Sequence, residues 1–372
     1  MVFKRVSIQA PELMAPSDGS TPRVRRGAQI FPAATLAIPA IEFGDVNPAS
    51  LDVRDELGLW KNGPMPIAEV HAFEVYDAVV HPPMGVITVG EFVLQETLAH
   101  LPVHLPGYGM VGNEVQFPIV PKNLEIGHGL HAMGGNSGNY FHWLLEIVPR
   151  LQVGPFAPSL TDGMVLLSSL ETKPQIDVMA LFGANRNPLL VQGSDYSIHL
   201  SSLLFVPNLA GYGFTPNPHL RSFFSRLKTL LDVDANPHRR IYVSRRDSKN
   251  RAMRNEQEVE TLVKEFGYEI VELTGLSLKE QAALFASASH VVAPHGAGVA
   301  NIIFCKEGTT LCELHMSNYL NPCFRRLAGV QHMRYGCLVG KTDRTGEQPD
   351  WPHGMPWTAP VDRLEAVLSQ IA

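Results

Sequence analysis

The sequence predicts an α/β protein whose C-terminal half carries a doubly wound parallel sheet. Two patterns lead to this class: strand and helix patterns alternate between residues 240 and 340, and a glycine-rich turn follows a buried strand at residues 290–301. Alternation of this kind implies parallel strands joined by right-handed crossovers. The length of 372 residues exceeds the size at which one hydrophobic core usually stops growing, so we expect two domains.

The first 125 residues are predicted to be irregular and rich in β-strands. Proline and glycine separate short apolar runs such as 68–80 and 85–94, and the second run alternates as a hairpin strand does. Lys4 and Arg5 are not followed by an apolar run, so a secretory signal peptide is not expected. No stretch approaches ~20 apolar residues, which leaves no candidate for a transmembrane helix.

Helix and strand patterns alternate again from residue 136 to 231. The expected elements are a helix at 140–151, a strand at 164–167, a helix at 175–182, a strand at 203–206 and a helix at 218–231. Residues 232–238 are interpreted as a linker to the C-terminal half.

The helix at 140–151 places two titratable side chains on one face. Asn139 is suited to cap its first turn, and His142 and Glu146 are four residues apart. The remainder of the helix is apolar, so we expect the pair to face a cleft rather than open solvent. A histidine oriented by a carboxylate can accept a proton near neutral pH. His128 and His131, in the preceding glycine-rich stretch, are alternative candidates.

Arginines follow the strand predicted at residues 241–246. Arg245 comes directly after Ser244, and Arg251 lies in the loop beyond. The planar guanidinium group matches phosphate oxygens in a way that the lysine ammonium does not. Asn255 and Glu258 then form the pattern of a capping box at the start of the next helix.

The stretch HVVAPHGAGVAN, residues 290–301, is the most informative in the chain. A second capping-box pattern, Ser277 to Glu280, opens the helix that leads into it. Its apolar strand ends at Pro294 and opens into the turn His295-Gly296-Ala297-Gly298, which precedes a helical pattern at 300–304. A strand, a glycine-rich turn and a helix in this order direct several backbone N–H groups at one spot, which binds an anion.

Glu313 interrupts the next apolar strand, at residues 310–314. A carboxylate inside a buried strand is costly without a partner, such as the two hydroxyls of a ribose. Arg245, the turn beginning at His295 and Glu313 would then lie at the carboxyl edge of one sheet, where open α/β sheets bind ligands.

Several blocks of the sequence carry a family resemblance when they are taken in order. These blocks are Gly138–Glu146 with Pro149-Arg150, Tyr242–Arg246, Arg254–Glu256, Leu278–Gln281, Pro294–Gly298 with Asn301, and Glu313-Leu314. Their order and spacing over roughly 130–335 resemble glycosyltransferase family 61. The resemblance implies an inverting, nucleotide-sugar-dependent enzyme of the GT-B architecture, with two Rossmann-like domains and a β-rich N-terminal segment.

The resemblance also implies how the chain is divided. Residues 1–125 would be the β-rich part of the acceptor domain and 126–235 its Rossmann-like part. Residues 236–340 would bind the nucleotide sugar, and 341–372 would form a tail whose helix packs back. An acceptor hydroxyl of a glycan or glycoconjugate would attack C1 of a UDP-sugar, as in the synthesis of surface or capsular polysaccharide.

Roles for individual residues follow from this reading. His142 is the expected general base, with Glu146 as the alternative base and His142 then binding the sugar. The expected nucleotide-sugar site comprises residues at strand ends of the C-terminal domain: Ser244, Arg245, Arg251, His295, Gly296, Ala297, Gly298, Asn301 and Glu313. Arg245 and Arg251 would hold the diphosphate, the turn amides would assist, His295 would touch the phosphate or sugar, and Glu313 would bind the ribose.

No cofactor or metal is expected, because arginines and a helix dipole can neutralise a leaving diphosphate. Asp232-Val233-Asp234 matches the D-x-D pattern of metal-dependent transferases, yet it lies far in sequence from every phosphate candidate and is interpreted as a solvated linker. The formal net charge of −6 argues against nucleic-acid partners. Four cysteines without C-x-x-C spacing indicate reduced thiols, with a disulfide as the alternative, and a cytoplasmic protein. This location is compatible with peripheral membrane contact.

Three other classes of protein share single features of this sequence. An esterase needs a Gly-x-Ser-x-Gly elbow, and Gly135–Asn139 fails this pattern at its last position. A nicotinamide enzyme needs a third glycine, and Gly296–Asn301 lacks it. The alternative that stays open is a catalytically inactive protein that binds a nucleotide sugar or glycan on the same fold.

Overall fold

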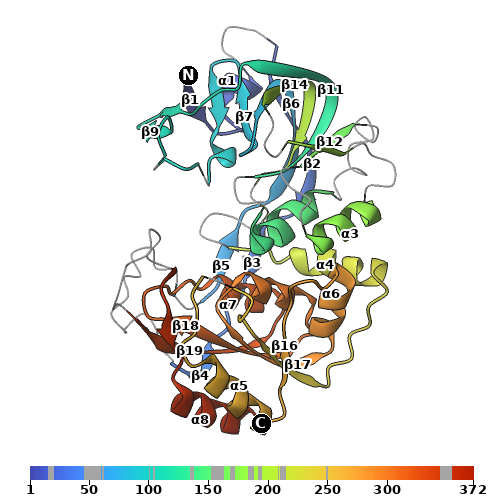
Figure 1. Ribbon diagram of the computed structural model, residues 1–372. Helices are drawn as coiled ribbons and strands as arrows, with labels where there is room; N and C mark the ends of the chain where they lie inside the picture. Colours follow the sequence, from blue (N-terminus) through green and yellow to red (C-terminus); the bar gives the residue numbers. More distant parts are fainter. Residues whose placement is uncertain are drawn as a thin grey trace. The chain divides into compact units, whose positions relative to one another are not determined.

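The computed structural model is a mixed α/β protein, as the sequence predicts (Figure 1). It describes residues 1–15, 21–45, 60, 63–99, 101–103, 105–134, 138–151, 163–167, 172–182, 188–191, 195–207, 209, 215–248, 250–343 and 354–372. Two compact units can be distinguished: unit 1 comprises Met1–Ala33 and Ala68–Ala210, and unit 2 comprises Ala34–Ile67 and Gly211–Ala372. The sequence-based boundaries at residues 125, 235 and 340 remain a prediction.

Unit 1 is built on one large mixed sheet. Its strands are β1 (Val2–Val6), β2 (Val24–Phe31), β6 (Val70–His81), β7 (Val86–Val89), β8 (Phe92–Leu94), β9 (Gly109–Val111), β10 (Glu114–Gln116), β11 (Lys122–Ala132), β12 (Met164–Leu167), β13 (Pro188–Leu190) and β14 (Tyr196–Phe205). Their spatial order is β13-β12-β11-β14-β6-β7-β8-β1-β10-β9, with β2 also paired to β6. The helical segments are α1 (Pro11–Met14), η2 (Gln95–Thr97), α2 (Tyr140–His142), η3 (Trp143–Ile147) and α3 (Lys173–Phe182).

The strands at one end of this sheet are parallel. β11 pairs in parallel with both β12 and β14, and β12 pairs in parallel with β13. The chain therefore winds outward from β11 to β13 and then returns to the other side of β11 as β14. Ligands of open α/β sheets bind at the carboxyl ends of strands where the order reverses in this way, which here are β11 and β14.

The helix predicted at 140–151 changes its pitch along its length. It starts as α2, continues as the π-helix η3 and ends in a 3₁₀ turn at 148–151. Asn139 Oδ1 accepts a hydrogen bond from the Phe141 amide at 3.0 Å, which confirms the predicted cap. Short π-helical segments are uncommon and occur frequently at functional sites.

Unit 2 contains the predicted doubly wound sheet. Its strands are β3 (Ala34–Leu36), β4 (Ile41–Gly44), β5 (Met65–Ile67), β15 (Arg239–Val243), β16 (Glu269–Val271), β17 (Ala288–Pro294), β18 (Thr310–Met316), β19 (Arg334–Thr342) and β20 (Trp357–Thr358). The main sheet has the order β16-β15-β17-β18-β19-β20, with β4 on β19, while β3 and β5 form a separate pair. Strands β15 to β19 pair in parallel, as the alternating pattern predicts.

Helices cover both faces of this sheet (Figure 1). They are α4 (Leu220–Leu230), α5 (Glu256–Glu265), α6 (Leu278–Ala286), η6 (Ala297–Phe304), α7 (Cys323–Val330) and α8 (Val361–Ile371). α5 and α8 pack on one face, where their apolar residues share a core with β15, β17 and β18. η6 contacts α4, α6 and α7.

Of the two predicted capping boxes, one is formed and one is wrong. Ser277 and Glu280 cap α6 reciprocally, as predicted. Asn255 stands at the start of α5 but makes no side-chain cap. Its amide instead pairs with the Ala359 backbone, donating to the carbonyl at 3.0 Å and accepting from the amide at 2.9 Å. An asparagine side chain offers both a donor and an acceptor, so the segment before α8 competes successfully for it.

Residues 34–67, although N-terminal in the chain, belong to unit 2. β4 pairs in parallel with β19. The fully buried guanidinium of Arg325 donates to the Pro39 carbonyl at 2.7 and 2.9 Å and to the Trp60 carbonyl at 3.1 Å. A buried cation needs such acceptors, so it holds this segment against α7. Within the described residues, no helix is long and apolar enough to cross a membrane.

Candidate functional site

The strand order of unit 2 reverses between β15 and β17. These neighbours are parallel, with β16 beyond β15 and β18 beyond β17. Arg245 follows the carboxyl end of β15, and His295 and Gly296 follow that of β17. The sequence therefore places its main phosphate candidates at the position where doubly wound sheets bind ligands.

Arg245 lies directly against the backbone of Gly296. A Cβ atom on Gly296 would overlap the Arg245 guanidinium group, although the extended backbone at this position suits any residue. Glycine therefore leaves the space that the Arg245 guanidinium fills, and backbone freedom is not the reason for it. This contact brings Arg245 together with the glycine turn, although the two are far apart in the sequence.

The guanidinium of Arg245 is only partly satisfied by its surroundings. Nη2 donates to Ser248 Oγ at 2.8 Å and to the Asn250 carbonyl at 3.1 Å. Nε is buried and has no hydrogen-bond partner among the described residues. Burial lowers the pKa of Arg245 to about 10, and the nearby charge of Arg251 acts in the same direction. At neutral pH the group remains a cation with a spare donor.

Arg251 supplies the second cation. Its guanidinium carbon lies 5.5 Å from the centre of the Tyr319 ring, a cation–π contact. Its backbone has a φ of 60°, in the left-handed region that non-glycine residues rarely occupy. The Arg251 carbonyl accepts a hydrogen bond from Trp357 Nε1 at 3.0 Å, which holds this conformation. Burial lowers the pKa of Arg251. An anion between the two arginines would relieve their mutual repulsion.

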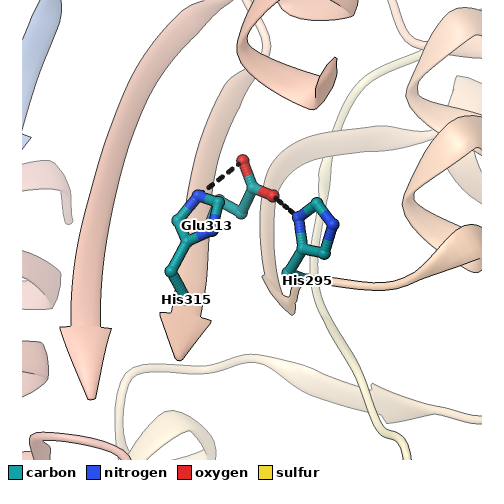
Figure 2. Close-up of side chains that lie close together, drawn as sticks. All are labelled: His295, Glu313 and His315. Carbon is teal, nitrogen blue, oxygen red and sulfur yellow. Dashed lines mark hydrogen bonds and ion pairs between the residues drawn. The ribbon is translucent and has the colours of Figure 1, made fainter. Parts of the chain in front are cut away.

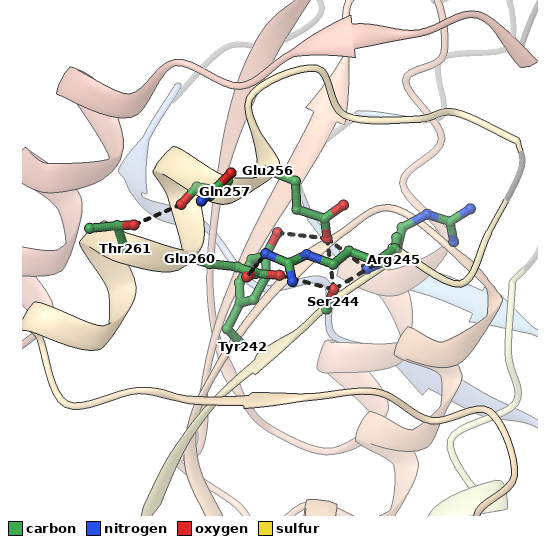
Figure 3. A network of polar contacts seen from close by, with 8 residues as sticks. Tyr242, Ser244, Arg245, Glu256, Gln257, Glu260 and Thr261 are labelled. Carbon is green, nitrogen blue, oxygen red and sulfur yellow. Dashed lines mark hydrogen bonds and ion pairs between the residues drawn. The ribbon is translucent and has the colours of Figure 1, made fainter.

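Ser244 has a supporting position rather than one that faces a ligand (Figure 3). Its hydroxyl donates to Glu256 Oε1 at 2.9 Å, and the same oxygen accepts the Arg245 amide at 2.8 Å. Glu260 is paired with Arg246 and also accepts from Ser244, at 3.3 Å. This buried network fixes the backbone from which Arg245 projects.

His295 is held by a buried carboxylate (Figure 2). Its Nδ1 lies 2.5 Å from Oε1 of Glu313. The other carboxylate oxygen, Oε2, accepts from the Tyr335 hydroxyl at 2.7 Å and lies 3.2 Å from His315 Nε2. His295 is 6% exposed and Glu313 is 0% exposed.

The electrostatics of this group fix the tautomer of His295. Burial opposes ionisation of Glu313, but the His315 and His295 rings lower its pKa to about 2. Burial lowers the pKa of His295 to about 4 despite the carboxylate. At neutral pH, therefore, Nδ1 carries the proton donated to Glu313. Nε2 is then the unprotonated nitrogen, which can accept a hydrogen bond.

This geometry differs from the role that the sequence suggests for Glu313. Its side chain has no exposed surface and both oxygens are engaged, so it presents no oxygen to a ribose hydroxyl.

The sequence interpretation did not include His315 and Tyr335 in this group. The alternation of side chains along β18 places Glu313 and His315 on the same face, which is a usable signal, whereas Tyr335 lies on another strand.

Asn301 ties the glycine turn to the fold. Its side-chain amide donates to Gln281 Oε1 at 2.8 Å and to the Gly298 carbonyl at 3.1 Å, and it is 0% exposed. Ala297 and Gly298 open η6, so their amides lie in its first turn.

Two groups have the residue types of a metal site. The ligand atoms of His295, Glu313 and His315 lie within 4.8 Å of one another. Each carboxylate oxygen is directed at a different ring, however, so we interpret the group as a hydrogen-bonded chain (Figure 2). The D-x-D residue Asp232 is 97% exposed and pairs with Lys279 at 3.3 Å, as a solvated linker residue would.

In unit 1, the predicted pairing of His142 and Glu146 on one helix face is present. His142 Nδ1 and Glu146 Oε1 are 2.9 Å apart, with the His142 side chain 8% and the Glu146 side chain 24% exposed. One turn further, the buried Arg150 donates to the Met133 carbonyl at 3.0 Å and lies 3.3 Å from His131 Nδ1.

The alternative histidines lie on β11 and have structural partners. His128 Nδ1 is 2.9 Å from Ser202 Oγ on the neighbouring strand. His131 Nε2 is 2.8 Å from the Gly85 carbonyl, and burial lowers its pKa to about 3. Of the histidines considered, His142 is therefore the one paired with a partly exposed carboxylate.

The curated proteins contain no match to this sequence. The family model described as Glycosyltransferase 61 matches residues 140–312, from the start of α2 to the residue before Glu313. The matched segment includes His142, Arg245 and the glycine turn. Over this segment, the chain is similar to glycosyltransferase family 61.

Proposed function

We propose that this protein is an inverting glycosyltransferase that moves a sugar from a UDP-sugar to a hydroxyl of a glycan or glycoconjugate. The family that residues 140–312 match implies transfer of a sugar between a donor and an acceptor. The observation that carries the donor assignment is the contact of Arg245 with the Gly296 backbone at the strand reversal of unit 2. Both strand orders also support a GT-B architecture, and surface polysaccharide is a fitting acceptor.

The donor diphosphate would bind to the cations and amides at the ends of β15 and β17. Arg245 would use its unpartnered Nε, Arg251 would add a second charge, and the amides of Ala297 and Gly298 would donate from the first turn of η6. Such preformed donors stabilise the charge that develops on a leaving diphosphate. Because the two arginines supply positive charge, we propose that no metal is needed.

The chemical step joins the acceptor oxygen to C1 while the bond from C1 to the diphosphate oxygen breaks. The electron pair of that bond leaves with the diphosphate, and the hydroxyl proton passes to a base. We assign the base to His142, with Glu146 holding its ring through Nδ1, so that Nε2 is the accepting nitrogen. Glu146 is the alternative base. In this scheme Glu313 orients His295, and Ser244 and Asn301 support the loop and the turn.

The test combines binding with transfer. A thermal-shift panel of nucleotide sugars should give a stabilised protein with UDP-sugars, since ligand at a hundred times its dissociation constant adds ~2.7 kcal/mol. The bound donor is then incubated with and without acceptor glycans, and released UDP is measured. Stabilisation with slow UDP release supports the enzyme. Stabilisation without any release favours an inactive binding protein, and no stabilisation by any nucleotide would overturn the proposal.

A further inference from the structure

Glu313 is a buried anion without a permanent cation in contact. Its partners are the phenol of Tyr335 and the imidazoles of His295 and His315. Among the described residues no lysine or arginine forms an ion pair with it. Because an isolated buried charge is costly, this carboxylate favours a proton on the adjacent imidazole.

His295 also faces groups that oppose that proton. The titratable and charged groups around the His295–Glu313 pair come from β18, the segment after it, β19, α7 and the loop after β15. His315, Tyr319 and Arg251 act on His295, and Tyr335 and Cys323 act on Glu313. The positive charge of Arg251 and the burial of the ring disfavour an imidazolium, whereas Glu313 favours it. In the free protein the balance leaves Nε2 unprotonated.

A bound diphosphate would favour protonation of His295 in two ways. It would offset the charge of Arg251 and place phosphate oxygens near Nε2, which in its free form is an acceptor that repels them. We propose that binding of a nucleotide diphosphate is coupled to the uptake of one proton by the His295–Glu313 pair. This inference rests on the proposed function, because the ligand is the donor diphosphate.

The proton comes from solvent and forms the Nε2–H bond. Nε2 then donates to a phosphate oxygen while Nδ1 continues to donate to Glu313, so the imidazolium is hydrogen-bonded to an anion on each side. When the diphosphate leaves, the proton returns to solvent. Glu313 is therefore a positioning residue, and His295 is the group that touches the ligand.

Calorimetry measures this coupling directly. UDP-glucose, UDP-xylose and UDP-N-acetylglucosamine are titrated into the protein near neutral pH, in two buffers whose ionisation enthalpies differ. The diphosphate of a nucleotide sugar is a diester without a group that titrates near neutrality, so any exchanged proton belongs to the protein. The binding enthalpy should depend on the buffer with a slope of about one proton taken up per ligand.

Two variants assign that proton. Glu313→Gln retains an oxygen that can accept from Nδ1 but lacks the charge, so uptake should fall several-fold while binding persists. His295→Gln should abolish uptake. The matched control is His290→Gln, which changes a half-buried histidine of β17 outside the site and should retain both binding and uptake. If the Glu313 variant does not fold, the wild-type slope and the His295 variant decide.

The outcomes separate this inference from the proposed function. Binding whose enthalpy is independent of the buffer would overturn proton coupling and leave the donor site intact. Uptake that persists in His295→Gln would assign the proton to another group and also overturn it. If no nucleotide sugar binds, the proposed function fails and the coupling fails with it.

Discussion

Replacing Gly296 with alanine is the most direct test of the proposed phosphate site. Because a Cβ at this position would overlap the Arg245 guanidinium, the arginine must move away from the turn. The backbone is extended here, so alanine itself adds no conformational strain. Loss of the charge-assisted contacts of Arg245 should weaken UDP binding by about 1–3 kcal/mol, which corresponds to about 5- to 150-fold in Kd.

The assay is calorimetric titration with UDP, accompanied by a thermal melt of each variant. Gly127→Ala is the matched control, because a Cβ at Gly127 meets nothing within 4 Å. It should bind UDP as the wild type does. If Gly296→Ala melts normally and binds UDP with unchanged affinity, Arg245 does not hold the diphosphate, and the strand reversal of unit 2 is not the donor site.

Four further outcomes are expected. Arg245→Lys keeps the charge but loses the planar fork, so UDP affinity measured by calorimetry should fall by about 1–3 kcal/mol; unchanged affinity would show that Arg245 does not bind the diphosphate. His142→Ala should reduce transfer roughly a hundredfold without altering UDP affinity, and the kcat/KM profile should lose its acidic limb; a retained limb would move the base to Glu146. Acidification from pH 6.5 toward 4 should lower the free energy of unfolding in urea, because burial lowers the pKa of His81 and of His295 from 6.5 to about 4 and both take up protons on unfolding; a flat profile over that range would contradict this burial effect. Chelation of divalent metals should leave transfer unchanged, and activity that is lost with EDTA and restored by a metal would refute a purely cationic site.

Local patterns were sufficient for the elements and groups that depend on neighbours in sequence. The α/β alternation predicted the parallel strands of unit 2, and the turn after Pro294 was placed correctly at a strand end. The pairing of His142 with Glu146 depends only on helical spacing, so it too was accessible. The capping box at Asn255 failed because its competitor, Ala359, lies 104 residues away.

The sequence by itself determined the fold class, the strand ends and the residue types gathered there, because periodicity and turn chemistry act over a few residues. Only the tertiary structure decided which of those residues meet. The role of Glu313 is the clearest case: one strand supplies it and His315, another supplies Tyr335, and the end of a third supplies His295. A buried carboxylate must find partners, but sequence spacing does not reveal whether they are side chains from neighbouring strands or a ligand. Parallel pairing brings those strands together, so the partners were set by strand order rather than by distance along the chain.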